Sequence, residues 1–245
     1  MSTRITRIIT EARVILNDTN RGRWTDRRLV ALISTGQREI CRKLPLLTKT
    51  ATINVFSGQE LYDLPYNAVT LLTARSSTRS LSMVTMEAMD DINFDWEDEI
   101  GASIDAIVVN NLSQKQIRPY PLISADATTQ ALKIRYSYLP ESINYDADNS
   151  TVVDIVVDTD LEIEEMWDEA IIQYVVGKAF IDYGDTSALS RAQVALGEFA
   201  SIMKEASTKS KRSFSKRKLT TGYNNKIRGR ESTVSNTCYS SLRLN

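Results

Sequence analysis

The chain has 245 residues, 42% of them hydrophobic, and a formal net charge of -1; this apolar content is enough to bury a substantial core. It contains no histidine, which excludes Ser-His-Asp and Cys-His nucleophile systems and His-ligated zinc. The small net charge results from segregation: residues 1–84 hold 13 basic and 6 acidic side chains, 85–170 hold 4 and 20, and 171–245 hold 13 and 5. Such segregation favours self-association or docking onto charged partners.

Residues 1–47 are expected to form an N-terminal helical hairpin. The first helix is predicted over 3–16, with Arg4, Arg7, Glu11 and Arg13 largely on its polar face. Thr25 is the expected N-cap of a second helix, which continues to about Leu44 before Pro45. The apolar stripes of the two helices are Ile5, Ile8, Ile9, Ala12, Ile15 and Leu16, and then Leu29, Leu32, Ile33, Gly36, Ile40 and Leu44.

Residues 48–159 are predicted to be a β-rich insertion. Ala51, Ile53 and Val55 alternate with polar residues, as in a half-buried strand, and further alternating segments follow up to Pro140. One short helix, capped by Thr85, is expected among these strands. We therefore expect this region to be mostly antiparallel.

Residues 160–207 are predicted to form two C-terminal helices, one from about Asp160 and one over about 186–207. Packed with the N-terminal pair, they would complete a four-helix body. The expected fold class is therefore α+β: a four-helix body, a β insertion and an extended C-terminal arm. The predicted buried face of the first of these helices comprises Leu161, Ile163, Trp167, Ile171, Tyr174, Val175, Ala179 and Phe180; that of the second comprises Leu189, Ala192, Leu196, Phe199, Ala200 and Met203.

Residues 208–245 lack helical or strand periodicity and are expected to be a basic arm that becomes ordered only on a partner. Residues 209–230 contain nine Lys or Arg and no acidic residue. The segment could bind nucleic acid, could be a solvated terminus, or could dock into an acidic groove of another protein. The candidate docking residues are Lys209, Lys211, Arg212, Phe214, Lys216, Arg217, Lys218, Leu219, Tyr223, Lys226, Ile227, Arg228 and Arg230.

Other motifs have simpler interpretations. The acidic cluster from Glu162 to Glu169 could supply a metal site or a glycosidase-like pair such as Glu164 and Asp168, but an exposed first helical turn is the commoner explanation. Asp146, Asp148 and Ser150 resemble the start of a calcium loop, without its glycine and final Glu. No phosphate-binding glycine loop or membrane-spanning run is present, and no cofactor, metal or catalytic residue is expected.

The remaining Trp and Cys residues are expected to be structural. Core packing is favoured over interface anchoring for Trp24, Trp96 and Trp167. Cys41 and Cys238 lie far apart in the chain and are interpreted as reduced thiols.

The order of these segments resembles that of the head-to-tail adaptor, or connector, proteins of tailed bacteriophages. The most specific part of the resemblance is the segment from Arg23 to Leu29, R-W-T-D-x-x-L, and it extends more weakly over about residues 3–205, including Leu64-Pro65 and the strand from Lys133 to Pro140. The family-motif positions are Arg13, Leu16, Asp18, Arg23, Trp24, Thr25, Asp26 and Leu29.

This resemblance implies a structural virion protein and no enzyme. Members of such families form a ring of about twelve copies below the portal protein, extend the channel through which DNA passes, and attach tail nozzle or tail tube proteins. The protein would lie in the virion neck after synthesis in the bacterial cytoplasm, without a membrane partner. In related adaptors a C-terminal arm contacts the portal, a role that falls on residues 208–245 here. A nucleic-acid-binding protein using the basic arm is the alternative.

Overall fold

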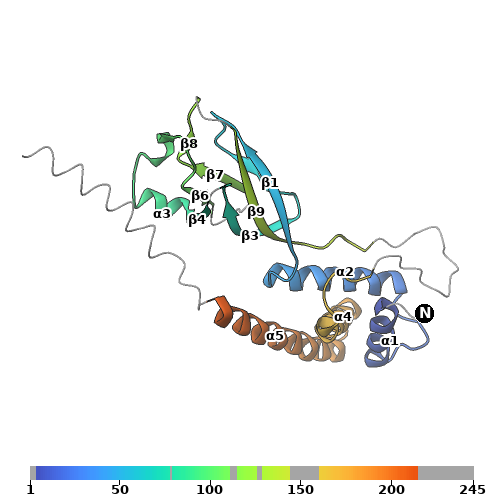
Figure 1. The fold of residues 1–245 in the computed structure, drawn as a ribbon. Coiled ribbons are helices and arrows are strands. Elements are labelled where there is room, and N and C mark those ends of the chain that lie inside the picture. The colour runs from blue at the N-terminus through green and yellow to red at the C-terminus, as the bar shows by residue number, and fades with distance from the viewer. Residues whose placement is uncertain (1–3, 78, 111–114, 126–128, 144–159, 215–245) are drawn as a thin grey trace, which may run out of the picture. The chain divides into compact units, whose positions relative to one another are not determined.

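The computed structural model describes residues 4–77, 79–110, 115–125, 129–143 and 160–214 (Figure 1). The chain divides into two compact units. The helical unit combines Met1–Thr48 with Ser137–Arg212, and the β unit contains Lys49–Tyr136. The mixed α+β class predicted from the sequence is confirmed.

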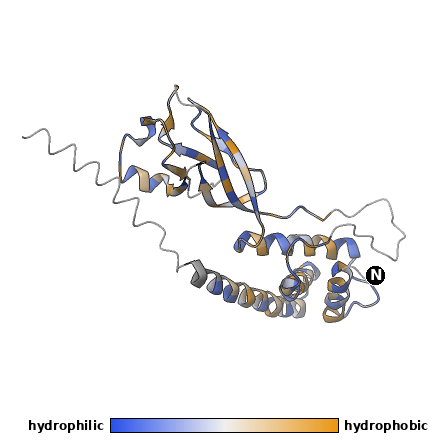
Figure 2. Cartoon of the chain, viewed as in Figure 1, coloured by the Kyte–Doolittle hydropathy of each residue, from blue (hydrophilic) through white to orange (hydrophobic). Residues whose placement is uncertain are grey.

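In the part of the chain that the structure describes, the helical unit contains four long helices. They are α1 (Arg4–Leu16), α2 (Asp26–Lys43), α4 (Asp168–Tyr183) and α5 (Thr186–Phe214), and a short 3-10 helix η2 (Glu165–Trp167) precedes α4. Thr25 caps α2 as predicted, because its hydroxyl accepts a hydrogen bond from the Arg28 N–H at 3.2 Å. Both hydrophobic and hydrophilic residues lie along α1 and α2, as expected for amphipathic helices (Figure 2).

All four long helices contribute to one core. The predicted stripe of α2 is buried at every position, and so is the predicted face from Leu161 to Phe180. The helices approach closely where glycine removes a side chain: a Cβ on Gly36 would lie 3.0 Å from Tyr174 Cδ1, and one on Gly177 would lie 2.6 Å from Leu196 Cγ. Trp24 and Trp167 are buried in this core, as expected.

Several predicted details of the helical unit are wrong. Ile15 and Leu189 are 47% and 42% exposed, and Ala200 is exposed, because each lies at the margin of a stripe that is narrower than the sequence pattern suggested. Arg13, expected on a polar face, is buried. The predicted helix from Asp160 begins as α4 only at Asp168.

The last helix also differs from the prediction at its C-terminal end. We expected it to end near residue 207, whereas α5 continues to Phe214 and so includes the first residues of the predicted arm. The Lys, Arg and Ser residues of this segment form no apolar stripe in the sequence, so hydrophobic periodicity gave no evidence of a helix there. These residue types are nevertheless compatible with a helix.

Among its described residues, the β unit contains a seven-stranded sheet with the order β1-β9-β3-β4-β6-β7-β2, and a small sheet of β5 and β8. Its strands are β1 (Thr48–Val55), β2 (Tyr62–Asp63), β3 (Ala68–Arg75), β4 (Ser80–Thr85), β5 (Ile100–Gly101), β6 (Ala106–Val109), β7 (Gln116–Tyr120), β8 (Leu122–Ile123) and β9 (Gln130–Tyr138). The described pairs β2–β7, β3–β4 and β6–β7 are antiparallel, whereas β4–β6 and β5–β8 are parallel.

A helical connection explains the parallel pair β4–β6. The chain leaves β4 through α3 (Met86–Asp90), capped by Thr85 as predicted, and through the 3-10 helix η1 (Trp96–Asp98), before returning along β6. Trp96 and Met89 of this connection are buried in a small core with Ala106 and Val108. The large sheet is thus mostly antiparallel, as expected.

Candidate functional site

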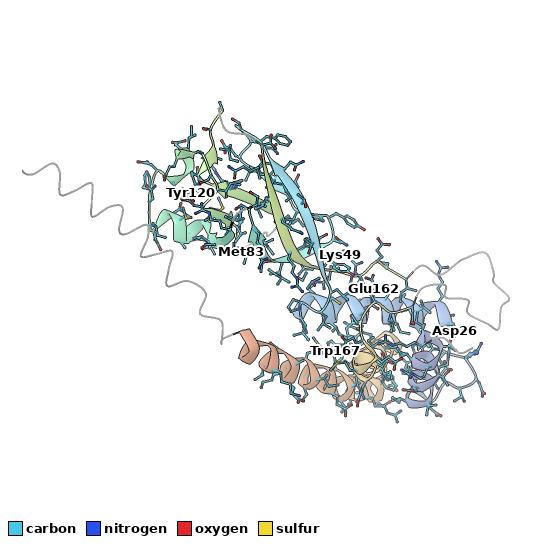
Figure 3. All side chains as sticks on the ribbon, viewed as in Figure 1. Asp26, Lys49, Met83, Tyr120, Glu162 and Trp167 are labelled. Carbon is cyan, nitrogen blue, oxygen red and sulfur yellow. The ribbon has the colours of Figure 1, made fainter. Side chains whose placement is uncertain are left out.

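The family-motif positions converge on the turn between α1 and α2. From the last turn of α1, the Arg13 guanidinium donates to Asp18 Oδ2 and to the Trp24 carbonyl, both at 2.9 Å. It also forms an ion pair with Asp26, in the first turn of α2 (Figure 3). The Arg13 side chain is only 6% exposed, so this network is a buried one. The planar guanidinium group of Arg13 carries several N–H donors, and it can therefore bind three acceptors at once.

Asp18 organises the loop itself. Its carboxylate accepts the N–H groups of Gly22, Arg23 and Trp24 at 2.8–3.1 Å. Burial alone would raise the pKa of Asp18, but these three N–H groups and the Arg13 guanidinium together lower its pKa below the ordinary value. The loop therefore contains a carboxylate that is stabilised in its charged form.

The loop begins with a capping motif at the C-terminal end of α1. The Asp18 N–H binds the Arg13 carbonyl at 3.0 Å and the Asn17 N–H binds the Val14 carbonyl at 3.1 Å, with Asn17 in the left-handed region at φ 53°. This is a Schellman motif, which satisfies carbonyl groups at the end of α1. Arg21 is also left-handed, at φ 57°, a conformation that the Asp18 hydrogen bonds help to maintain.

Trp24 joins this turn to α4 within the helical unit. Its indole N–H donates to the Ala179 carbonyl at 3.2 Å, and its ring contacts Phe180 edge-on with centroids 6.3 Å apart. Arg23, next to it, is exposed and lies over the Tyr183 ring at 4.9 Å. The motif therefore fixes the angle between α1 and α2 and places Arg23 on the surface.

Two side chains of the acidic cluster from Glu162 to Glu169, those of Asp168 and Glu162, have partners within the helical unit. The Asp168 carboxylate forms ion pairs with Arg4 and Arg7 of α1, and Arg4 also donates to the Ile163 carbonyl. Glu162 accepts a hydrogen bond from the Tyr138 hydroxyl at 2.8 Å. Among the described residues no group of His, Cys, Asp or Glu is arranged to hold a metal ion. Asp168 is thus positioned to join α1 to α4.

A family model described as SU10 adaptor protein matches residues 3–221. The chain belongs to this family. It is a family of bacteriophage head-to-tail adaptors, which are structural proteins of the virion neck, so the resemblance seen in the sequence is confirmed. No curated protein matches the chain. In the described part of this adaptor, no helix is long and apolar enough to cross a membrane.

The structure describes only the first four of the adaptor's candidate docking residues. Lys209 lies on α5, where it pairs with Glu205 at 2.7 Å, and Lys211, Arg212 and Phe214 belong to the last turns of the same helix. Outside the described residues are Lys216, Arg217, Lys218, Leu219, Tyr223, Lys226, Ile227, Arg228 and Arg230, together with Cys238 and the calcium-loop-like residues Asp146, Asp148 and Ser150.

The sequence analysis included Arg13 among the expected motif positions but missed its central role in the turn. The sequence pattern assigned Arg13 to a polar face with Arg4, Arg7 and Glu11, because all four side chains are charged. The available clue was the conjunction of one Arg at the end of a helix with Asp18 and Asp26 around the following turn. Only the folded turn brings these three side chains together.

Proposed function

We propose that this adaptor assembles as a ring of about twelve copies below the portal protein, extends the DNA channel and attaches tail nozzle or tail tube proteins. The family match over residues 3–221 carries this proposal. The preorganised turn around Arg13 supports it, because a ring requires every copy to present its surfaces at the same angle. The protein is made in the cytoplasm of the bacterial host and reaches the neck during assembly.

The C-terminal arm is proposed to bind the portal. Residues 209–230 contain nine basic and no acidic side chains, so the arm suits an acidic groove. An arm that binds weakly as a single copy binds firmly when many copies engage one platform, because each further contact is effectively intramolecular. The first residues of this arm, up to Phe214, belong to the last turns of α5.

The acidic middle of the chain is proposed to face the channel. Residues 85–170 hold 20 acidic and 4 basic side chains, and a channel wall of this charge repels DNA phosphates so that the genome passes without sticking. Tight binding of this region to DNA at physiological salt would contradict the assignment.

Co-sedimentation with the portal protein encoded by the same phage tests the proposed docking. Three forms are compared: the full chain, a chain ending at Phe214 that keeps α5 intact, and a full-length variant with Lys216, Arg217 and Lys218 replaced by Gln. We expect the full chain to bind, the truncated chain to lose binding, and the Gln variant to bind more weakly and with less dependence on salt. Lys204→Gln, an exposed substitution on α5, is the matched control.

Equal portal binding by all of these forms would contradict the role of the arm. The nucleic-acid alternative predicts a different pattern: no portal binding, but DNA binding that falls steeply with salt and disappears with the truncation.

A further inference from the structure

The connection between β4 and β6 is strongly acidic. Residues 80–114 contain eight Asp or Glu and no Lys or Arg. Most of these acidic side chains lie within Met86–Ile100, which we call the Phe94 loop. An acidic loop is ordinarily a solvated surface. Its backbone contacts and its exposed apolar side chains must therefore show whether it is an interface.

The Phe94 loop is held firmly against the β unit. The buried Trp96 indole donates to Asp90 Oδ1 at 2.8 Å, and Arg118 of β7 lies over the Trp96 ring at 5.0 Å while donating to the Glu97 carbonyl at 2.7 Å. The Tyr120 hydroxyl donates to Glu99 (Figure 3 labels Tyr120). The backbone of the loop is thus fixed at several points.

This fixed loop displays two apolar side chains. Phe94 is 90% exposed and Ile100 is 66% exposed, while Asp91, Asp95 and Asp98 around them are exposed too. No basic side chain in the described part of the chain pairs with these three carboxylates. Two exposed apolar side chains on a fixed loop that also carries unneutralised acids suit a partner with an apolar centre and a basic rim.

The helical unit carries a surface with this complementary chemistry. At the end of α4, Ile181 and Tyr183 are 42% and 48% exposed. Arg23 lies over the Tyr183 ring, and the first turn of α2 is joined to this end of α4 by the Arg28–Asp182 ion pair. Arg27 in that turn is exposed. We call this end of α4, with Arg23 and the first turn of α2, the Tyr183 corner.

We propose that the Phe94 loop of one copy packs on the Tyr183 corner of a neighbouring copy. This inference rests on the proposed ring, because a ring is built from contacts between two different surfaces of identical copies. The opposite charges favour this occupant: residues 1–48 hold ten basic and four acidic side chains, whereas residues 80–114 hold no basic one. Phe94 supplies the buried centre of the contact, and the Asp–Arg pairs supply its orientation and salt dependence.

Two variants and their mixture test the contact by sedimentation velocity. The loop variant is Phe94→Ala with Asp95→Lys; the corner variant is Arg23→Glu with Arg27→Glu. Each alone should associate at least about tenfold more weakly than the wild-type chain. In an equal mixture, a functional corner on the loop variant meets a functional loop on the corner variant. We therefore expect the mixture to form heterodimers and nothing larger.

Matched substitutions and a truncation complete the design. Tyr66→Ala in the β unit and Lys204→Glu on α5 alter exposed residues elsewhere, and should leave association unchanged. The chain ending at Phe214 should also associate normally, since the arm is not part of this contact. All of the altered side chains are exposed, so circular dichroism and thermal unfolding should match the wild-type chain.

Three results would overturn the inference: wild-type chains that remain monomeric, variants that associate like the wild type, or a mixture that remains monomeric. Loss of association on truncation after Phe214 would instead assign the loop to the basic arm of another copy. Portal binding measured on the same samples keeps the two proposals separate. Rings on the portal that are unaffected by either variant would overturn this contact and leave the proposed function intact.

Discussion

At the scale of single residues, Arg13 is the side chain on which the adaptor turn depends most. It donates to Asp18, Asp26 and the Trp24 carbonyl from a buried position. Arg13→Ala leaves two carboxylates without their shared cation. Removing one partner of a buried ion pair costs about 3–5 kcal/mol, and we expect a loss of this size in the free energy of unfolding, measured by urea denaturation.

Two comparisons make this prediction specific. Arg13→Lys keeps the charge but not the planar fork, and should be intermediate in stability. Arg27→Ala, at an exposed position in the first turn of α2, should change the free energy of unfolding by less than about 0.5 kcal/mol. An Arg13→Ala variant as stable as the Arg27→Ala variant would show that the network does not support the turn.

Asp18 gives the helical unit a defined response to acid. Its pKa is lowered in the folded protein by the three N–H groups and by Arg13, against the effect of burial. The resulting stabilisation is therefore fully present above the ordinary Asp pKa of about 4 and is lost as the pH falls through the lower folded value.

The change that isolates this effect is Asp18→Asn. The free energy of unfolding of the wild-type chain should fall more steeply below about pH 4 than that of Asp18→Asn, which is less stable at neutral pH but lacks this titration. Parallel pH profiles from denaturant unfolding would contradict the lowered pKa.

At the scale of elements, the close approach of α4 and α5 depends on Gly177. A Cβ at this position would lie 2.6 Å from Leu196 Cγ and 2.8 Å from its Cδ2. Gly177→Ala should therefore force the two helices apart and reduce the free energy of unfolding by about 1–3 kcal/mol, despite the higher helix propensity of Ala.

Gly197 on α5 is a natural control, because a Cβ there meets nothing within 4 Å. Gly197→Ala should stabilise the chain by about 0.5–1 kcal/mol through helix propensity alone. Thermal unfolding of both variants checks the pair. A similar rise in stability for both would show that α4 and α5 are not in tight contact at Gly177.

The elements also show what could be predicted from the sequence. Local chemistry was sufficient for the N-caps Thr25 and Thr85 and for the α2 stripe, because capping hydroxyls and helical periodicity depend on near neighbours. The strand order and the parallel pair β4–β6 could not be predicted, since they depend on contacts between distant segments. The burial of Arg13 could not be predicted either, because its partners come close to it only in the folded turn.

At the scale of the whole molecule, the segregated charge connects the sequence to assembly. The basic helical hairpin is proposed to contact the Phe94 loop of a neighbouring copy, the rest of the acidic middle to face the channel, and the basic arm to bind the portal. These roles require the units to act in many copies at once. The adaptor family identifies the general role of the protein. The proposals assign parts of that role to particular surfaces of the chain.

The measurement that tests the central claim most directly is electron cryo-microscopy of the adaptor bound to its portal protein. The account predicts a closed ring of about twelve adaptor copies below the portal, with density for the residues after Phe214 on the portal surface. The chain ending at Phe214 should lack that density and show few or no rings. A portal without an adaptor ring, or a ring held on it equally well by the truncated chain, would contradict the account.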